Sequence, residues 1–434
     1  MHRKAMVLAV GAALAAPSAY AQLKSPAGST WEFYGKFYPE LTTTSGGGAT
    51  SVGESVATLA RTPAGGGAIV HRWEMQPNNT YFGFRANKDL GGGMKAIAQL
   101  EQSVPLDEGT VTANSAGLIN TFGNRDSFVG LEAVWGTVRL GNMDTPFKRF
   151  GDTLGFLGIG SGNFVSPNNV IRRVSNSSPS GFNLRRANSV DFASQEYSGA
   201  QLAVQYSLGN PTEAGTSATP GAATVQNSAI DPSANRSPRV ISMAVKWERG
   251  PFYAALAAER HFDLFGGSGL TSGGATPSVA TSNAGIATVN SKDTAVQLTG
   301  VYKIGVHSIE LDVNSKLYKE TGATAANAFQ EYKNRAYEAI WEARWTAQWR
   351  TAFSYIRATA GDCTLAINSC STAGMDATQI NAGVTYSFDP STYLFALYSR
   401  LKNGSSARYN NSAQGSPNDG EDITQAALGL AYVF

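Results

Sequence analysis

The sequence predicts an all-β fold, a closed antiparallel transmembrane β-barrel of about sixteen strands. Three observations lead to this prediction. Segments of about ten residues alternate apolar with polar side chains along most of the chain, short turns alternate with long connections, and the alternation continues to the last residue, Phe434. Each feature is typical of barrels that cross an outer membrane.

The alternation is clearest in the first segment. The apolar face would hold Trp31, Phe33, Phe37 and Leu41, and the opposite face Glu32, Tyr34, Lys36, Tyr38 and Glu40. Successive side chains of a strand point to opposite sides, so one face of this segment is apolar and the other is charged. A two-sheet sandwich could produce each such segment singly, but it needs only about seven to nine strands. Aromatic residues on the apolar face and the charged opposite face favour the membrane barrel.

The connections alternate between short and long. Short turns are expected at residues 89–93, 135–136, 250–251 and 389–391. Long connections are expected at residues 45–67, 104–123, 144–185, 210–236, 263–292, 321–331, 360–376 and 403–422. Long outer loops and short periplasmic turns are the asymmetry of outer-membrane barrels. Eight long connections imply eight hairpins and therefore sixteen strands.

Residues 1–21 have the features of a signal peptide, and residues 22–434 would form the barrel domain. A basic start precedes an apolar stretch from Ala5 to Ala16, and Ala19 and Ala21 supply small residues for cleavage. A retained anchor is the alternative, but the apolar stretch is too short to span a bilayer as a helix. Cleavage would remove two of the 34 basic residues, against 32 acidic ones. A neutral mature chain argues against a nucleic-acid partner.

Several segments resemble the general porins of β-proteobacteria, a Gram-negative porin family. Residues 82–85 with 89–96 resemble the second hairpin of that family, 128–131 with 136–141 its fourth and fifth strands, and 186–190 its sixth strand. The resemblance spans the mature chain and implies a homotrimer whose third outer loop folds inward to narrow the pore. The final strand, with Tyr432 and terminal Phe434 on one face, resembles the assembly signal read by the outer-membrane insertion machinery.

Pore-lining residues follow from the alternation together with this resemblance. Val138 and Leu140 would face lipid, so Arg139 would face water, and Phe82 and Phe84 place Arg85 inside in the same way. The predicted pore-lining or constriction residues are Arg85, Arg139, Arg186, Lys36, Asp144 and Asp152. The sequence does not distinguish whether the cations of the third loop line the pore or lie outside it; these are Lys148, Arg149, Arg172 and Arg173. Alternatively, the basic residues clamp lipopolysaccharide phosphates or pair with acidic residues of the loop.

Other chemistry is sparse in this sequence. His71, His261 and His307 lack metal-ligand spacing, so no metal, cofactor or enzymatic activity is predicted. Residues 419–422 (DGED) could bind a divalent ion but are more typical of a solvated loop. Cys363 and Cys370 fall in one predicted outer loop, and the oxidising periplasm favours a disulfide between them.

The resemblance implies an outer-membrane porin, a water-filled channel for passive diffusion of small hydrophilic solutes and ions. A substrate-specific channel for sugars or carboxylates is the alternative. The three arginines predict a preference for small anionic or neutral solutes, because a narrow aqueous passage focuses the field of a charge cluster. Inward acidic residues oppose this, namely Glu32, Glu40, Glu132, Glu310, Asp312 and Glu342. We expect most of them to lie away from the third loop and to be screened from it by salt.

Overall fold

The computed structural model describes residues 23–24, 28–60, 63–77, 79–106, 123–160, 162–174, 181–208, 239–264, 290–322, 326–413 and 415–434. The predicted signal peptide, residues 1–21, lies outside the described residues, and so do large parts of the second, fourth and fifth long connections. The cleavage site and the boundaries of these connections therefore remain predictions.

The described chain is almost entirely β-strand. Its strands are β1 (Leu23–Lys24), β2 (Ser29–Phe37), β3 (Glu40–Gly47), β4 (Arg72–Gln76), β5 (Tyr81–Gly91), β6 (Met94–Ser103), β7 (Ser127–Ala133), β8 (Gly136–Asp144), β9 (Arg185–Ser194), β10 (Ala200–Leu208), β11 (Arg239–Arg249), β12 (Phe252–Phe262), β13 (Asn290–Ile304), β14 (His307–Thr321), β15 (Phe329–Arg344), β16 (Trp349–Ala358), β17 (Asp362–Leu365), β18 (Ala377–Ser387), β19 (Thr392–Asn403) and β20 (Asp422–Val433). All of them belong to one sheet.

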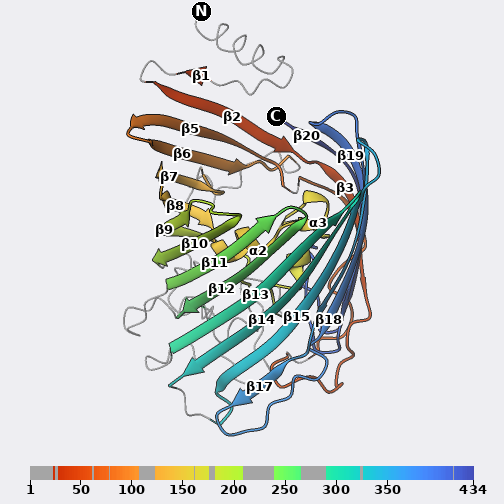
Figure 1. Ribbon diagram of the computed structural model, residues 1–434. Helices are drawn as coiled ribbons and strands as arrows, with labels where there is room; N and C mark the ends of the chain where they lie inside the picture. The colour runs from red at the N-terminus through yellow and green to blue at the C-terminus, as the bar shows by residue number, and fades with distance from the viewer. Residues whose placement is uncertain are drawn as a thin grey trace, which may run out of the picture.

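The sheet closes on itself. All pairings are antiparallel and join successive hairpins, with β2 pairing with β5 and β16 with β18 where a strand is interrupted. The last strand, β20, pairs with β3 from Asp422↔Gly47 to Gly429↔Glu40. The closing seam continues into β2, and the backbones of Phe434 and Gly35 exchange hydrogen bonds of 2.9 and 3.0 Å. Closure leaves no sheet edge in lipid, where unpaired backbone groups would be costly. Figure 1 shows β20 and β2 meeting at this seam.

The described segments form sixteen strands, which confirms the predicted barrel. The sheet contains more segments than that because some strands are interrupted. Tyr38 and Pro39 separate β2 from β3, and residues 77–80 separate β4 from β5. Segment β17 continues β16 along the same partner, β15, while β1 is a two-residue addition to β2. Cys363 therefore lies on a strand rather than in the predicted loop, and its sulfur is bonded to that of Cys370.

Side chains alternate between the two faces of the wall as expected. In β14, Leu311 and Val313 are 59% and 43% exposed on the outer face. Glu310, Asp312 and Asn314 alternate with them and are buried inside the barrel. Burial of so many polar groups requires partners within the lumen.

Those partners come mainly from the third long connection, between β8 and β9. It contains two short α-helices, α2 (Pro146–Gly151) and α3 (Gly155–Gly158), and a 3₁₀ turn, η1 (Pro167–Asn169). Thr145 caps α2, accepting a hydrogen bond from the Lys148 amide, and Pro146 stands at the first helical position. None of the described helices is long and apolar enough to cross a membrane. In Figure 1, α2 and α3 lie within the ring of strands, where α2 packs on β11 and β12 and α3 on β16.

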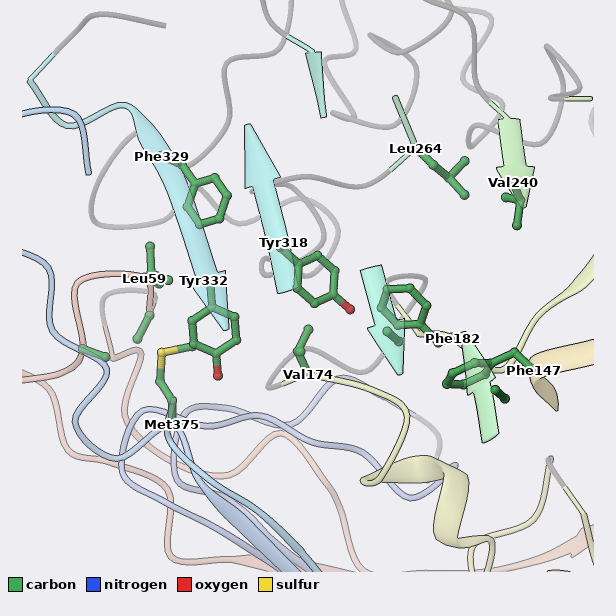
Figure 2. Packing of buried hydrophobic residues seen from close by; sticks show 14 of the residues in the cluster. Leu59, Phe147, Val174, Phe182, Val240, Leu264, Tyr318, Phe329, Tyr332 and Met375 are labelled. Atoms are coloured by element: carbon green, nitrogen blue, oxygen red, sulfur yellow. The ribbon is translucent and has the colours of Figure 1, made fainter. Parts of the chain in front are cut away.

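An apolar cluster holds this connection against the wall (Figure 2). Phe147 and Phe182 come from the connection, and Tyr318 and Tyr332 come from β14 and β15. Leu59 of the first long connection joins the same cluster. Burial of these side chains stabilises each by roughly 1.5–3 kcal/mol relative to an exposed position. Two connections far apart in sequence are thus packed inside one end of the barrel.

Candidate functional site

The inner segment, defined here as the described residues of 145–184, follows the wall of the lumen. The amide of Leu154 donates to Glu310 of β14 at 2.7 Å. Asn163 donates to both carboxylate oxygens of Glu40 on β3 at 3.1 Å, and Gln379 of β18 donates to the carbonyl of Phe164 at 2.9 Å. The segment therefore lines the wall from α2 on β11 and β12 round to β18 and β3.

This course corrects one expectation. Most of the six inward acidic residues were expected to lie away from the third loop, but Glu40, Glu310 and Glu342 accept hydrogen bonds from it. Each is at most 4% exposed, because the inner segment covers it. Glu342 also pairs with Arg350, and Asp312 is buried beside Gln297. These acidic groups anchor the segment and do not face open water.

The opposite part of the wall, β2 and β5 to β9, carries exposed cations. Arg85 is exposed on the inward side of β5, with its guanidinium 3.9 Å from the centroid of the Tyr34 ring. The Tyr34 hydroxyl donates to Glu101 at 3.0 Å, and Arg85 donates to Gln99 at 3.2 Å. Gly83 makes room for this stack, since a Cβ there would lie 2.6 Å from the Tyr34 ring.

Two more cations lie over tyrosine rings on the same wall. Lys36, a predicted residue, is 4.2 Å from the ring centroid of Tyr38, and Arg125 is 4.5 Å from that of Tyr81. Arg125 also forms an ion pair with Glu101. A cation over an aromatic face is held in place without losing its charge, so Arg85 presents a fixed positive charge, whereas the charge of Arg125 is offset by Glu101.

Arg139 also faces inward, but it is not isolated. Its Nε donates to Oδ1 of Asp191 on β9 at 3.0 Å, and Arg149 of α2 approaches Oδ2 at 2.7 Å. Asp191 is fully buried, whereas the side chains of Arg139 and Arg149 remain 18% and 20% exposed. One carboxylate thus joins two guanidiniums, which leaves an excess positive charge at the junction of wall and segment.

The predicted acidic residues have different partners. Asp144 lies between Lys148 at 2.9 Å and Arg185 at 3.0 Å, so it is paired on both sides. Asp152 accepts a hydrogen bond from Asn168 within the inner segment at 2.9 Å. Neither residue forms an acidic cluster facing the arginines.

Arg186 lies elsewhere than the other predicted arginines. It is 6% exposed and close enough to His261 of β12 to influence that ring electrostatically. His261 contacts Glu259 at 2.8 Å and stacks under Phe182 at 4.5 Å. Arg186, at the start of β9, therefore lies under the inner segment and is not open to the lumen. Arg172 is also buried there and donates to Gln297 at 2.9 Å.

Three residues of this wall, Arg125, Glu101 and Asp191, were not predicted from the sequence. Asp191 was recognisable, because Val190 and Phe192 on either side of it are outward apolar residues. Arg125 directly follows a long connection and precedes β7, so no alternation indicated its direction. Its position depends on Glu101, which is distant in sequence.

Metal binding finds no support in the described part of the chain, where no group of three His, Cys, Asp or Glu side chains could hold an ion. The 419–422 loop is instead engaged in internal contacts. Glu421 accepts the amides of Ala68 and Ile69 at 2.9 and 2.8 Å, and Asp419 pairs with Arg408 at 2.8 Å.

Comparison with known proteins is consistent with this geometry. The sequence profile described as Gram-negative porin matches residues 5–406. The major outer membrane protein P.IB of Neisseria lactamica is 36% identical over 124 residues, 29% of this chain and 32% of that protein. Protein P.IA of Neisseria meningitidis (strain H44/76) is 32% identical over 136 residues, 31% of this chain and 30% of the relative. The chain thus matches about a third of the length of these relatives.

Two solved structures share the fold over nearly the whole chain. The anion-selective porin from Comamonas acidovorans has a TM-score of 0.63 at 18% identity, covering 94% of this chain and 100% of that one. The trimer form of OmpT from Vibrio cholerae has a TM-score of 0.58 at 13% identity, covering 94% and 99%.

Proposed function

The chain belongs to the Gram-negative porin family and lies in the outer membrane of a Gram-negative bacterium, and from this premise we propose that it forms a water-filled channel for passive diffusion of small hydrophilic solutes. The polar inner face of a closed barrel supports this role. Membership of a porin family favours a channel over an enzyme.

We further propose that the channel prefers anions. One observation carries this proposal: the inner segment covers Glu40, Glu310 and Glu342, while the wall opposite presents Arg85 on β5 and the partly open guanidinium of Arg139 on β8. A charge in a narrow aqueous passage with low-dielectric walls raises the local concentration of the opposite ion. Guanidiniums lining a pore therefore favour chloride and small carboxylates or phosphates over cations. The Comamonas acidovorans porin, which shares this fold, is anion-selective, and this agrees with the inference.

Liposome swelling tests passive diffusion against a substrate-specific channel. Purified protein in vesicles should admit uncharged sugars at rates that fall with solute size and rise linearly with concentration. Flux that saturates for one sugar or carboxylate would instead favour the substrate-specific channel, and impermeable vesicles would contradict both. Boiled, unfolded protein is the control.

We also propose a homotrimer, inserted through recognition of Tyr432 and Phe434. The OmpT structure described as a trimer form supports the oligomeric state by analogy of fold. Detergent-extracted protein should migrate as a trimer before heating and as a monomer after it. A monomer before heating, confirmed by light scattering, would contradict this assembly.

A further inference from the structure

A cavity opens inside the barrel at the end where the short turns lie. It has a volume of about 670 Å³ and lies between helix α3 and the ends of β15, β16, β18 and β19. The turns at residues 345–348 and 388–391 form its rim. Short turns mark the periplasmic side of an outer-membrane barrel, so the cavity lies on the periplasmic side of the inner segment. A volume of this size admits a small organic molecule.

Five side chains of the wall point into this cavity and form one row across four strands. They are Arg344 of β15, Arg350 of β16, Thr385 and Ser387 of β18, and Tyr393 of β19. Thr385 is itself buried, and each of the others lies two positions from a buried residue of its strand, so all five face the lumen. In the register of the sheet, Arg344 lies opposite Arg350, Arg350 opposite Thr385, and Ser387 opposite Tyr393.

Helix α3 covers the cavity on the side of the inner segment. Leu157 of α3 is part of the lining, and its amide donates to Glu342 of β15. Gly383 of β18 lets Leu157 approach the wall, since a Cβ at that position would lie 2.7 Å from Cδ1 of Leu157. Leu157 and the ring of Tyr393 therefore give the cavity an apolar side next to the row of polar groups.

The two guanidiniums lie on neighbouring strands, and only one of them is neutralised. Arg350 forms an ion pair with Glu342. Over the residues that the structure describes, the exposed side chain of Arg344 has no partner in a hydrogen bond or an ion pair. Like charges directly opposite in a sheet repel each other. An anion held at Arg344 therefore relieves a repulsion that the chain itself leaves in place.

The other polar groups of the lining are compatible with an anion. Asp389 also lines the cavity, but its carboxylate accepts the backbone amides of Ser391 and Thr392 at 2.7 and 2.9 Å and so belongs to the turn between β18 and β19. The hydroxyl groups of Thr385 and Ser387 can donate to a bound oxygen. One unpaired guanidinium, two hydroxyls and an apolar side thus surround the same space.

We propose that this cavity binds a small organic carboxylate with an aromatic or apolar body. The guanidinium of Arg344 holds the carboxylate through two parallel hydrogen bonds, a geometry that a carboxylate matches. Leu157 and Tyr393 contact the apolar body, and Thr385 and Ser387 donate to the remaining oxygen lone pairs. The inference rests on the channel proposed above, because the ligand reaches the cavity through the lumen, but it does not depend on the ion selectivity of the pore.

The test measures binding of 4-fluorobenzoate to the folded protein in detergent by ¹⁹F NMR titration, with the shift in empty micelles subtracted. Arg344→Gln removes the unpaired charge and should weaken binding at least tenfold, because hydrogen bonds between charged groups are the strong ones. Lys95→Gln is the matched control, since Lys95 is an exposed cation at the short-turn end of β6, distant from β15 in the sheet. The control should change the affinity by less than twofold.

The native protein supplies an arm that does not depend on any variant. We expect 4-fluorobenzyl alcohol, which has the ring without the charge, and fluoroacetate, which has the charge without the ring, each to bind at least tenfold more weakly than 4-fluorobenzoate. Equal binding of either compound would overturn the proposal, as would an unchanged affinity of the Arg344→Gln variant.

Liposome swelling with uncharged sugars separates this inference from the channel function. The Arg344→Gln variant should admit sugars at the native rate, because the replacement leaves the lumen open. Native protein that admits sugars but does not bind 4-fluorobenzoate would refute the cavity alone. Impermeable vesicles would instead contradict the proposed channel.

Discussion

One buried carboxylate, Glu421, helps to hold the first long connection in place. Glu421 is fully buried and accepts three backbone N–H groups: Ile69 at Oε1 at 2.8 Å, and Ala68 and Asn418 at Oε2 at 2.9 and 2.8 Å. Glycines leave space for it, since a Cβ at Gly46 or Gly67 would come within 2.6 or 2.8 Å of Oε1. This arrangement predicts that the charge of Glu421 holds residues 68–69 in place.

Glu421→Gln keeps the shape and removes the charge. The amide oxygen can replace Oε2, but the NH₂ group would then face the Ile69 amide, leaving a buried donor without an acceptor. An unsatisfied buried group costs about 1–3 kcal/mol, and hydrogen bonds to a charged acceptor are stronger than those to an amide. Together these effects should lower the free energy of local opening by about 2–4 kcal/mol, so that residues 68–69 open roughly 30–1,000 times more often.

Hydrogen exchange of the Ala68 and Ile69 amides measures this opening directly. We expect exchange at these two amides to accelerate by that factor while the amides of β14 keep their rates. Glu54→Gln is the matched control, because Glu54 is exposed and, among the residues that the structure describes, accepts only the Ser51 amide at 3.3 Å. Exchange at Ala68 and Ile69 within threefold of the native rate would refute the reasoning.

Three further predictions follow from other contacts. Gly429→Ala places a Cβ 2.1 Å from the Phe395 ring, which is itself stacked on Tyr38 at 4.2 Å. The free energy of unfolding measured in urea titrations should therefore fall by about 1–3 kcal/mol. Gly300→Ala, where a Cβ has no atom within 4 Å, should leave it unchanged. Thiol titration of denatured, unreduced protein should find no free thiol, and two thiols per chain would contradict the disulfide. Reduction of the Cys363–Cys370 bond should lower the free energy of unfolding by roughly 2–3 kcal/mol. Phe434→Ala should lower the amount of assembled protein several-fold, because the Phe434 ring lies 5.3 Å from the rings of both Phe33 and Phe37. Phe388→Ala, on an exposed turn, should leave the amount unchanged. Equal yields of the two variants would contradict the assembly signal.

Local alternation was enough to predict the barrel and the direction of most wall residues. Arg85 and Arg139 face inward because their neighbours in sequence are outward apolar residues, a relation fixed by strand geometry alone. Closure of the sheet was predictable too, since an open edge is not tolerated in lipid. Thr145-Pro146 was a recognisable helix start, although only a loop was expected there from the sequence.

The course of the inner segment was not predictable in the same way. It depends on contacts between residues distant in sequence, such as Leu154 with Glu310 and Asn163 with Glu40. Alternation shows that Glu310 points inward but not whether water or chain covers it. The balance of exposed charge in the lumen, on which selectivity depends, therefore required the tertiary structure.

The zero-current potential across a planar bilayer under a potassium chloride gradient tests the central claim most directly. The native channel should give a potential displaced toward the chloride equilibrium value, because Arg85 and Arg139 are open to the lumen while Glu40, Glu310 and Glu342 are covered. Arg85→Ala combined with Arg139→Ala should move it toward the potassium value, while Arg260→Gln on the outer face should leave it unchanged. Cation preference in the native channel, or a double variant whose potential does not move, would contradict the account.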